Sequence, residues 1–214
     1  MPKKNEQRSS RRAVVAAFIA AVVLSFLVMN AGYVAARLSL RLRGPAPVPP
    51  APARPETGTP PAAVPEPPRM MAPDRLQIPS LGLDVPLVYV QEKTEAAFQA
   101  GLRDGVVHYP GTAMPGEPGN AYYFGHSSDY VWSKGSYKNV FATLPEIKQG
   151  AAITVSGPDG RAYDYVVIVT RVVSPKDLSV LDQGDGTRSL LTLQTSYPLG
   201  TALKRFVAVA ELVR

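Results

Sequence analysis

Three polar residues lie at the ends of apolar runs, where a strand can fix a side chain that meets a ligand. His126 follows the run Ala121–Phe124 and one glycine, Ser196 ends the run that begins at Ser189, and Arg205 opens the last run. A histidine can transfer protons, a serine hydroxyl can act as a nucleophile and an arginine can stabilise an anionic oxygen. Taken singly, each is more often a hydrogen-bonded, turn or surface residue, so only their combination points to chemistry.

The segment around Ser196 has the alternation of a strand with two different faces. Side chains alternate between the faces of a strand, so Thr192, Gln194 and Ser196 share one face. Leu193 and Thr195 share the other face. A proline two residues beyond Ser196 has no amide hydrogen to donate and ends the ladder. We therefore expect Ser196 at the end of this strand.

Cysteine is absent from all 214 residues, and histidine occurs twice. The sequence therefore excludes disulfides, thiolate metal sites and a cysteine nucleophile. A zinc site would depend on His108, His126 and carboxylates, which argues against a structural zinc domain. We predict no metal ion and no cofactor.

The net charge of +6 is concentrated near the N-terminus. Residues 1–43 hold eight basic residues against one acidic residue, and residues 44–73 are neutral overall. From residue 74 onward there are thirteen basic and fourteen acidic residues, a net charge of −1. A folded part with this balance has no basic surface for a phosphate backbone, so we expect no nucleic-acid partner.

An uncharged and mainly apolar stretch covers residues 13–36. At about 1.5 Å per residue it is long enough to cross a hydrocarbon core about 30 Å thick. A cleavable signal peptide is the alternative, but its apolar region is usually about 7–15 residues. We expect an uncleaved transmembrane anchor in a lipid bilayer, with the basic tail 1–12 in the cytoplasm and the remainder outside a bacterial cell.

Proline dominates the segment that follows the predicted anchor. Twelve of the 22 prolines lie between residues 44 and 73, without periodic apolar residues. Such a sequence behaves as an extended spacer of about 3.1 Å per residue. We therefore expect residues 37–73 to form an extracellular stalk.

Residues 74–214 have the length of one domain. Short β-rich runs recur between turn signals, at 83–90, 121–124, 152–156, 163–173, 190–194 and 206–213. The turn sequence at 157–160 predicts a hairpin, and the helical signals are brief, at 94–100 and 137–144. This pattern favours an all-β, mainly antiparallel barrel or sandwich.

Considered together, the segments around His126, Ser196 and Arg205 resemble the sortase family, and the resemblance extends over residues 75–213. The matching elements occur in the family's order: Leu76–Pro79 as the first strand, His108–Thr112, Gly125–His126, and Thr192–Ser196, which is similar to the family's TLxTC signature. Arg205 follows nine residues after Ser196, where the family keeps its arginine. The resemblance implies a closed eight-stranded β-barrel with short helices, and it accounts for an N-terminal anchor.

The resemblance also implies a transpeptidase. Sortases cleave a sorting peptide of the LPxTG type and join its acyl group to an amine of the cell wall or of a pilus subunit. In that scheme Ser196 stands at the nucleophile position, His126 protonates the leaving amine and Arg205 stabilises the oxyanion. These residue types meet the needs of an acyl transfer.

Other residues near these three are candidates for binding the peptide. Gln194, Thr195 and the loop residue Trp132 are expected to contact it. His108 could lie near the mouth of the site, although a structural histidine at a turn is the interpretation we favour. No third residue that orients His126 is evident from the sequence, and Asp129 stays an open candidate.

The sequence departs from the family at the nucleophile, where Ser196 replaces cysteine. A serine alkoxide cannot be the resting state, so Ser196 needs a neutral His126 that acts first as base and then as acid. Three explanations stay open: an engineered replacement, a natural serine that works slowly, and a pseudoenzyme. The main alternative function is accordingly a non-catalytic protein of this fold that binds peptides or acts as a scaffold in surface assembly.

Overall fold

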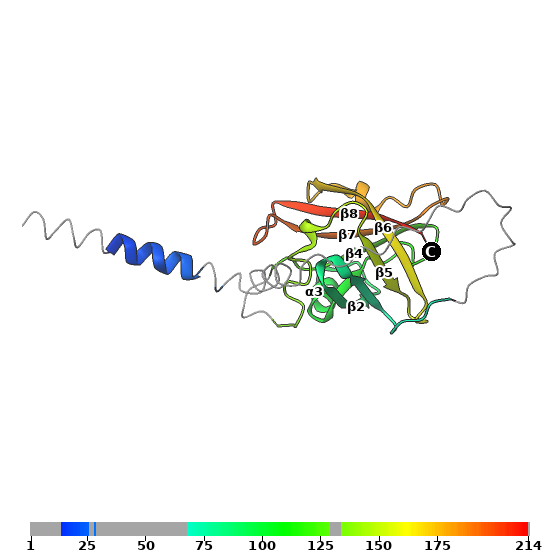
Figure 1. Cartoon of the computed structure of the whole chain (residues 1–214), viewed down its shortest axis with the longest axis horizontal. Helices are drawn as coiled ribbons and strands as arrows, with labels where there is room; N and C mark the ends of the chain where they lie inside the picture. Colours follow the sequence, from blue (N-terminus) through cyan, green and yellow to red (C-terminus); the bar gives the residue numbers. More distant parts are fainter. Residues whose placement is uncertain (1–13, 26–27, 29–67, 129–133, 214) are drawn as a thin grey trace, which may run out of the picture.

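The computed structural model describes residues 14–25, 28, 68–128 and 134–213. Residues 14–25 are helical, and this segment is coloured blue in Figure 1. No helix within the described residues has the length and apolar character needed to cross a membrane. Of the predicted anchor at 13–36, residues 14–25 and 28 are described, and of the predicted stalk at 37–73 only residues 68–73 are described. Anchor and stalk both stay predictions.

The strands of the described region close into one barrel, in the order β1-β2-β3-β4-β7-β8-β6-β5 (Figure 1). Two neighbouring pairs, β2 with β3 and β4 with β7, are parallel, and the others are antiparallel. The predicted closed, mainly antiparallel eight-stranded barrel is confirmed. Its strands are β1 (Arg75–Ile78), β2 (Leu83–Tyr89), β3 (Val106–His108), β4 (Gly119–Phe124), β5 (Ala152–Ser156), β6 (Ala162–Val173), β7 (Ser189–Tyr197) and β8 (Lys204–Leu212).

The barrel interior is filled by apolar side chains from alternate strand positions. On β7, Leu191 and Leu193 are fully buried in the core cluster. Between them, Thr192 faces outward, and its hydroxyl donates to Asn120 Oδ1 at 2.7 Å. This agrees with the alternation expected from the sequence. Because the register of β7 is fixed by its buried leucines, the face presented by the end of the strand is fixed too.

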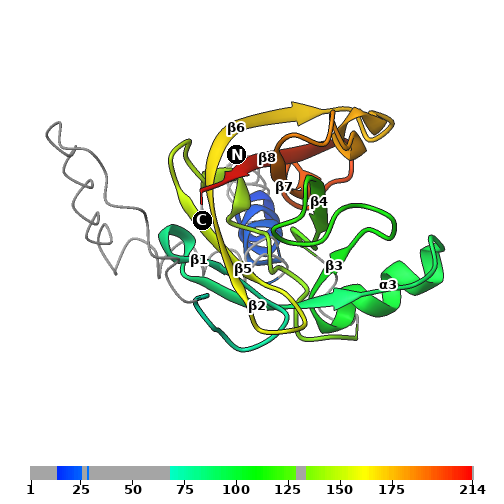
Figure 2. The ribbon, with the colours of Figure 1, turned by 90° about the vertical axis from the view of Figure 1, so that its right-hand side faces the viewer.

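One α-helix, α3 (Glu95–Asp104), connects β2 to β3 and lies on the outside of the barrel beside them (Figure 2). Its N-cap is Thr94, whose hydroxyl accepts from the Ala97 amide at 3.3 Å. This bond satisfies one of the amides that a helix leaves unpaired at its start. The expected helix near 94–100 is confirmed, and Gly101 lets it pack closely against β2 and β3: an added Cβ would meet Val107 at 2.9 Å.

The helix expected at 137–144 is not formed. The chain there makes successive turns, followed by the 3₁₀ helix η2 (Leu144–Glu146). The amide of Phe141 donates to His126 O at 2.9 Å, so it is not used in a helical ladder. A proline inside η2 also disfavours continuation of a helix. Two further 3₁₀ helices are η1 (Pro79–Leu81) and η3 (Leu178–Leu181).

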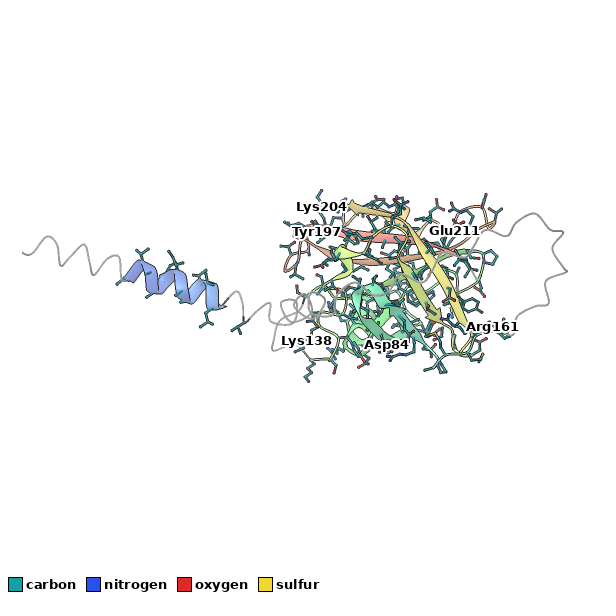
Figure 3. The ribbon with its side chains drawn as sticks, viewed as in Figure 1. Asp84, Lys138, Arg161, Tyr197, Lys204 and Glu211 are labelled. Atoms are coloured by element: carbon teal, nitrogen blue, oxygen red, sulfur yellow. The ribbon has the colours of Figure 1, made fainter. Side chains whose placement is uncertain are left out.

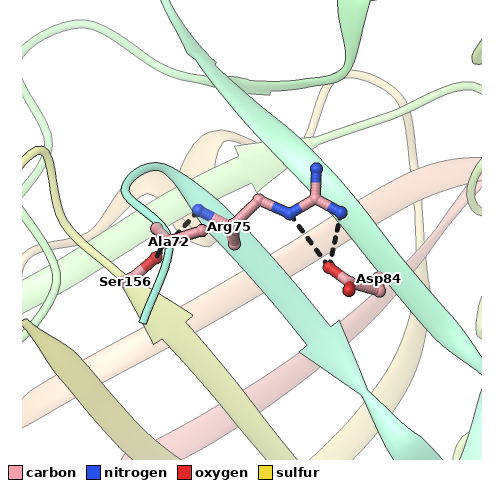
Figure 4. Close-up of polar contacts among 4 residues, drawn as sticks. All are labelled: Ala72, Arg75, Asp84 and Ser156. Carbon is pink, nitrogen blue, oxygen red and sulfur yellow. Dashed lines mark hydrogen bonds and ion pairs between the residues drawn. The ribbon is translucent and has the colours of Figure 1, made fainter. Parts of the chain in front are cut away.

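The predicted hairpin at 157–160 is present between β5 and β6, and Gly160 N donates to Gly157 O at 2.9 Å. The chain preceding β1 is bound to this hairpin. Ala162 N donates to Arg69 O at 2.8 Å, and Ser156 Oγ donates to Ala72 O at 2.6 Å (Figure 4). Residues 69–73, which the sequence assigned to the stalk, thus run along the β5–β6 hairpin.

We call residues 69–73 the strap; Arg75, two residues beyond it, is held on two sides. Arg75 N donates to Ser156 Oγ at 2.9 Å, and its guanidinium forms an ion pair with Asp84 across the β1–β2 pair at 2.6 Å (Figure 4). Figure 3 shows Arg161, at the hairpin, at the opposite end of the barrel from Tyr197 and Lys204. The chain therefore enters the barrel at the end far from the β7–β8 turn.

Candidate functional site

The loop that follows β4 holds His126 by its backbone. Gly125 N donates to Gln194 O at 3.1 Å, which extends the β4–β7 pairing by one residue. The Thr195 hydroxyl donates to Gly125 O at 2.9 Å, and Phe141 N donates to His126 O. Thr195 is only 2% exposed, so its hydroxyl is shielded from water. These bonds fix the backbone of His126 relative to the end of β7.

Residue 125, directly before His126, is a position where only glycine fits without a steric conflict. A Cβ at Gly125 would lie 2.9 Å from side-chain atoms of both Val140 and Phe141. Contacts under 3.0 Å force a neighbour to move, and Phe141 is fully buried in the core. The loop therefore passes directly over the end of the core only because residue 125 has no side chain.

Ser196 and Arg205 are brought together by the β7–β8 ladder, in which they are direct partners. Side chains at directly opposed antiparallel positions point to the same face, with Cβ atoms about 4.5–5.5 Å apart. The Arg205 guanidinium donates from Nη1 to Ala202 O and to Lys204 O, both at 3.1 Å. These bonds hold the guanidinium of Arg205 against the β7–β8 turn.

One pocket of about 260 Å³ brings the candidate residues together. Its lining comes from the end of β4 and the following loop, the end of β7, the start of β8 and one face of α3. The lining residues are Glu95, Phe98, Gln99, Leu102, Phe124, Gly125, His126, Ser127, Ser128, Gln194, Thr195, Ser196 and Arg205.

The pocket thus contains five of the six residues chosen from the sequence: His126, Gln194, Thr195, Ser196 and Arg205. The sixth, Trp132, lies outside the described residues, as does Asp129. Sequence reasoning missed the side of the pocket formed by α3, which we call the α3 wall. It consists of Glu95, Phe98, Gln99 and Leu102. The spacing of these residues places them on one helical face, but it does not indicate what that face contacts.

His108 does not line the pocket and is a structural residue. It is 5% exposed, and its Nε2 lies 3.0 Å from both Ala113 O and Thr112 Oγ1. Its ring packs between those of Tyr89 and Tyr123, at centroid distances of 5.3 and 4.9 Å. Burial lowers the pKa of His108 below its ordinary value.

Within residues 14–25, 28, 68–128 and 134–213, no three His, Asp or Glu side chains gather where they could hold a metal ion. The polar groups that line the pocket include the imidazole of His126, the hydroxyl of Ser196 and the guanidinium of Arg205. Such a set can supply a proton carrier, a nucleophile and an oxyanion donor.

Comparison with known proteins gives one family and one fold. The Sortase domain family matches residues 76–213. Sortase C-1 from Actinomyces oris is 28% identical, with a TM-score of 0.54 over 65% of this chain and 72% of its own. The comparison with curated proteins returned no match.

Two more solved structures share the fold at lower identity. A Clostridium perfringens sortase D5 transpeptidase is 24% identical, with a TM-score of 0.53 over 65% of this chain and 78% of its own. Sortase A from Corynebacterium diphtheriae, as a lid mutant, is 23% identical, with a TM-score of 0.55 over 68% of this chain and 72% of its own. The family match covers more than half of the sequence, and the barrel is that of the solved sortases: the chain belongs to the sortase family.

Proposed function

We propose that this protein is a sortase-type transpeptidase that cleaves an LPxTG-like sorting motif and transfers the acyl group to an amine. The observation that carries the proposal is the pairing of Ser196 with Arg205 on adjacent strands, in one pocket with His126. A nucleophile, a proton carrier and a cation converge there, and strand pairing holds two of them in register. Membership of the sortase family supports the same reaction class.

Acylation begins with a neutral His126. The imidazole takes the hydroxyl proton of Ser196 as Oγ bonds to the carbonyl carbon of the peptide threonine. The carbonyl oxygen becomes anionic, and Arg205 donates hydrogen bonds to it. When the carbon–nitrogen bond breaks, His126 gives the proton to the leaving amine. The products are an ester on Ser196 and a free amine on the released peptide.

Deacylation reverses these roles. A neutral amine of the acceptor bonds to the ester carbon and loses one proton to His126. His126 then returns that proton to Ser196 Oγ as the carbon–oxygen bond breaks, which regenerates the hydroxyl. The acceptor would be an amine of the cell wall or of a pilus subunit, and water in its place would give hydrolysis.

The hydroxyl of Ser196 makes this route slow compared with a thiol. A cysteine pKa of about 8.5 lies only about two units above that of imidazole, a gap of about 2.7 kcal/mol that a nearby arginine can offset. A thiolate–imidazolium pair is therefore accessible to a cysteine at residue 196, whereas an alkoxide is not accessible to serine. We expect Ser196→Cys to raise turnover strongly.

The lining residues of β7 have different parts in the proposal. Gln194 shares the outer face with Ser196, where its side chain can meet the peptide backbone. Thr195 lines the pocket but donates its hydroxyl to Gly125 O, so its principal part is to position the His126 loop. Trp132 stays a proposed peptide contact.

A membrane anchor at residues 13–36, with a cytoplasmic N-terminus and an extracellular domain, is part of the proposal. It rests on the apolar stretch and the basic flanks in the sequence. The strap 69–73 joins the barrel at the end opposite the β7–β8 turn. A domain attached in this way can present its pocket away from the point of attachment.

The alternative is a non-catalytic protein of the same fold that binds sorting peptides or acts as a scaffold in surface assembly. The serine at residue 196 is the observation that favours it. A scaffold, however, has no need for both His126 and Arg205 in one pocket with the nucleophile position.

Turnover of a fluorogenic LPxTG peptide separates the two functions when the chain with Ser196 is compared with Ser196→Cys. Turnover in both forms supports the serine enzyme. Turnover in the cysteine form alone makes the protein with Ser196 a binder, and turnover in neither form contradicts sortase chemistry at this pocket.

A further inference from the structure

The α3 wall of the pocket consists of four residues at helical spacing. Glu95, Phe98, Gln99 and Leu102 stand at positions i, i+3, i+4 and i+7 and therefore share one face of the helix. All four line the pocket that contains His126 and Ser196. The proposed acylation chemistry uses none of them. The acylation chemistry therefore does not account for a carboxylate, an amide and two apolar side chains on this wall.

A carboxylate is fixed at the N-terminal end of this face. Gln99 Nε2 donates to Glu95 Oε1 at 2.7 Å, an i, i+4 contact that keeps both side chains over the pocket. Among the ion pairs of the described residues, none involves Glu95. A carboxylate in a helix's first turn also interacts favourably with the helix dipole, but that interaction does not require the hydrogen bond to Gln99.

The other end of the face is apolar. The ring of Phe98 packs edge-on against Phe124 at a centroid distance of 5.2 Å and an interplanar angle of 88°. Leu102 is 7% exposed and completes this surface. The wall therefore offers a hydrocarbon surface that leads to a negative charge, which complements an alkyl chain ending in an ammonium group.

The two sides of the pocket carry opposite charges. The strand order β3-β4-β7-β8 puts α3, which lies beside β2 and β3, on one side and Arg205 of β8 on the other. His126 and Ser196 come from the strands between them. Carbonyl oxygens of an acyl donor are attracted to the Arg205 side, so the Glu95 side is left for a cationic ligand.

We propose that the α3 wall binds the incoming acceptor as a primary alkylammonium, with its nitrogen at Glu95 and Gln99 and its hydrocarbon stem on Phe98 and Leu102. This inference rests on the proposed function, because it names the acceptor class of the same pocket. The wall favours an amine on a long aliphatic chain, such as a lysine side chain, over the amine of a glycine.

Binding at this wall precedes the transfer. The ammonium gives one proton to solvent before its nitrogen bonds to the ester carbon on Ser196. A second proton then passes through His126 to Ser196 Oγ as the carbon–oxygen bond breaks. Glu95 gains no covalent bond, so its contribution is to the apparent affinity for the amine.

The inference is tested by binding to the full chain with Ser196, in detergent micelles and labelled with ¹³C at histidine. The chain has two histidines, so the spectrum reports His126 in the pocket and His108 away from it. Titration with n-butylammonium should shift the His126 signal saturably and leave that of His108 in place. Glu95→Gln should weaken this binding about fivefold, a typical upper value for an exposed charge pair.

Glu92→Gln is the matched control, since Glu92 is exposed and outside the pocket lining, and it should titrate as the parent chain does. Two results would overturn the inference: Glu95→Gln binding n-butylammonium as tightly as the parent, or n-butanol shifting His126 to the same extent as n-butylammonium.

A kinetic arm separates this inference from the proposed function. In Ser196→Cys, the ratio of aminolysis to hydrolysis should fall about fivefold with Glu95→Gln at low n-butylamine, through KM for the amine. An equal fall with Glu92→Gln would contradict a specific site. If Ser196→Cys forms no acyl-enzyme, the proposed function fails, and the histidine titration decides the ammonium site by itself.

Discussion

Ser196 lies directly opposite Arg205 in the β7–β8 ladder. The relationship does not depend on loops, because seven other residue pairs fix the register of these strands. Arg205 is also the last residue of β6's pairing with β8, opposite Val173. The cation is therefore held beside the nucleophile position by a three-stranded part of the barrel.

Replacing the cation tests this pairing. Arg205→Ala in the Ser196→Cys background should lower kcat/KM for an LPxTG peptide by about 100-fold, the scale of losing one oxyanion donor. Steady-state kinetics measures the change. Lys204→Ala, at the neighbouring exposed position, should leave kcat/KM within about twofold; an equal loss in both variants would show that the turn and not the guanidinium matters.

The hydroxyl of Thr195 should be required for stability as well as for activity. Thr195→Val removes the donor to Gly125 O and leaves a buried carbonyl unpaired, which costs about 1–3 kcal/mol of unfolding free energy. Urea unfolding measures this loss. Thr195→Ser keeps the hydroxyl and should lose less, and equal stability of the valine and parent proteins would contradict the assigned bond.

A side chain at residue 125 should disturb His126. Gly125→Ala would place a Cβ 2.9 Å from Val140 and Phe141 side-chain atoms, an overpacking that costs about 1–3 kcal/mol. The His126 ring signal should shift in the histidine-labelled spectrum. Gly157→Ala, where the nearest atom belongs to the Asp159 side chain at 3.2 Å, is the control and should leave that signal unchanged.

Stability should fall in mild acid because of His108. Burial holds its folded-state pKa below the value of about 6.5 in the unfolded chain. Below pH 6.5, His108 therefore binds a proton in the unfolded chain but not in the folded protein. The unfolding free energy declines with falling pH until the pH passes the folded-state pKa of His108. Urea unfolding between pH 7.5 and 4.5 measures the decline, and an identical decline in His108→Gln would refute the assignment.

Much of the barrel end could be predicted from local sequence. The alternation from Leu191 to Ser196 gave the correct face for each side chain, since buried leucines fix the register of β7. His126 and Arg205 were predicted as site residues from their places at strand ends, and both line the pocket. Thr94 identified the start of α3 through its capping side chain.

The α3 wall and the conformation of residues 137–144 could not be predicted, because both depend on contacts between segments that are distant in the sequence. The α3 wall joins the pocket only because β3, β4 and β7 are neighbours, and the parallel pairing of β4 with β7 has no local signal. The helix expected at 137–144 failed because Phe141 N bonds to His126 O, fifteen residues earlier. Local propensity cannot anticipate such a partner.

The most direct test of the account is the mass of the acylated protein. The full chain carrying Ser196→Cys is incubated with an LPxTG peptide, quenched in acid and analysed by intact mass and peptide mapping, with Ser196→Ala as the control. The account predicts an added acyl mass on residue 196 in the cysteine form, removed by an amine, and none in the alanine form. No adduct in the cysteine form, or an adduct on another residue, would contradict it.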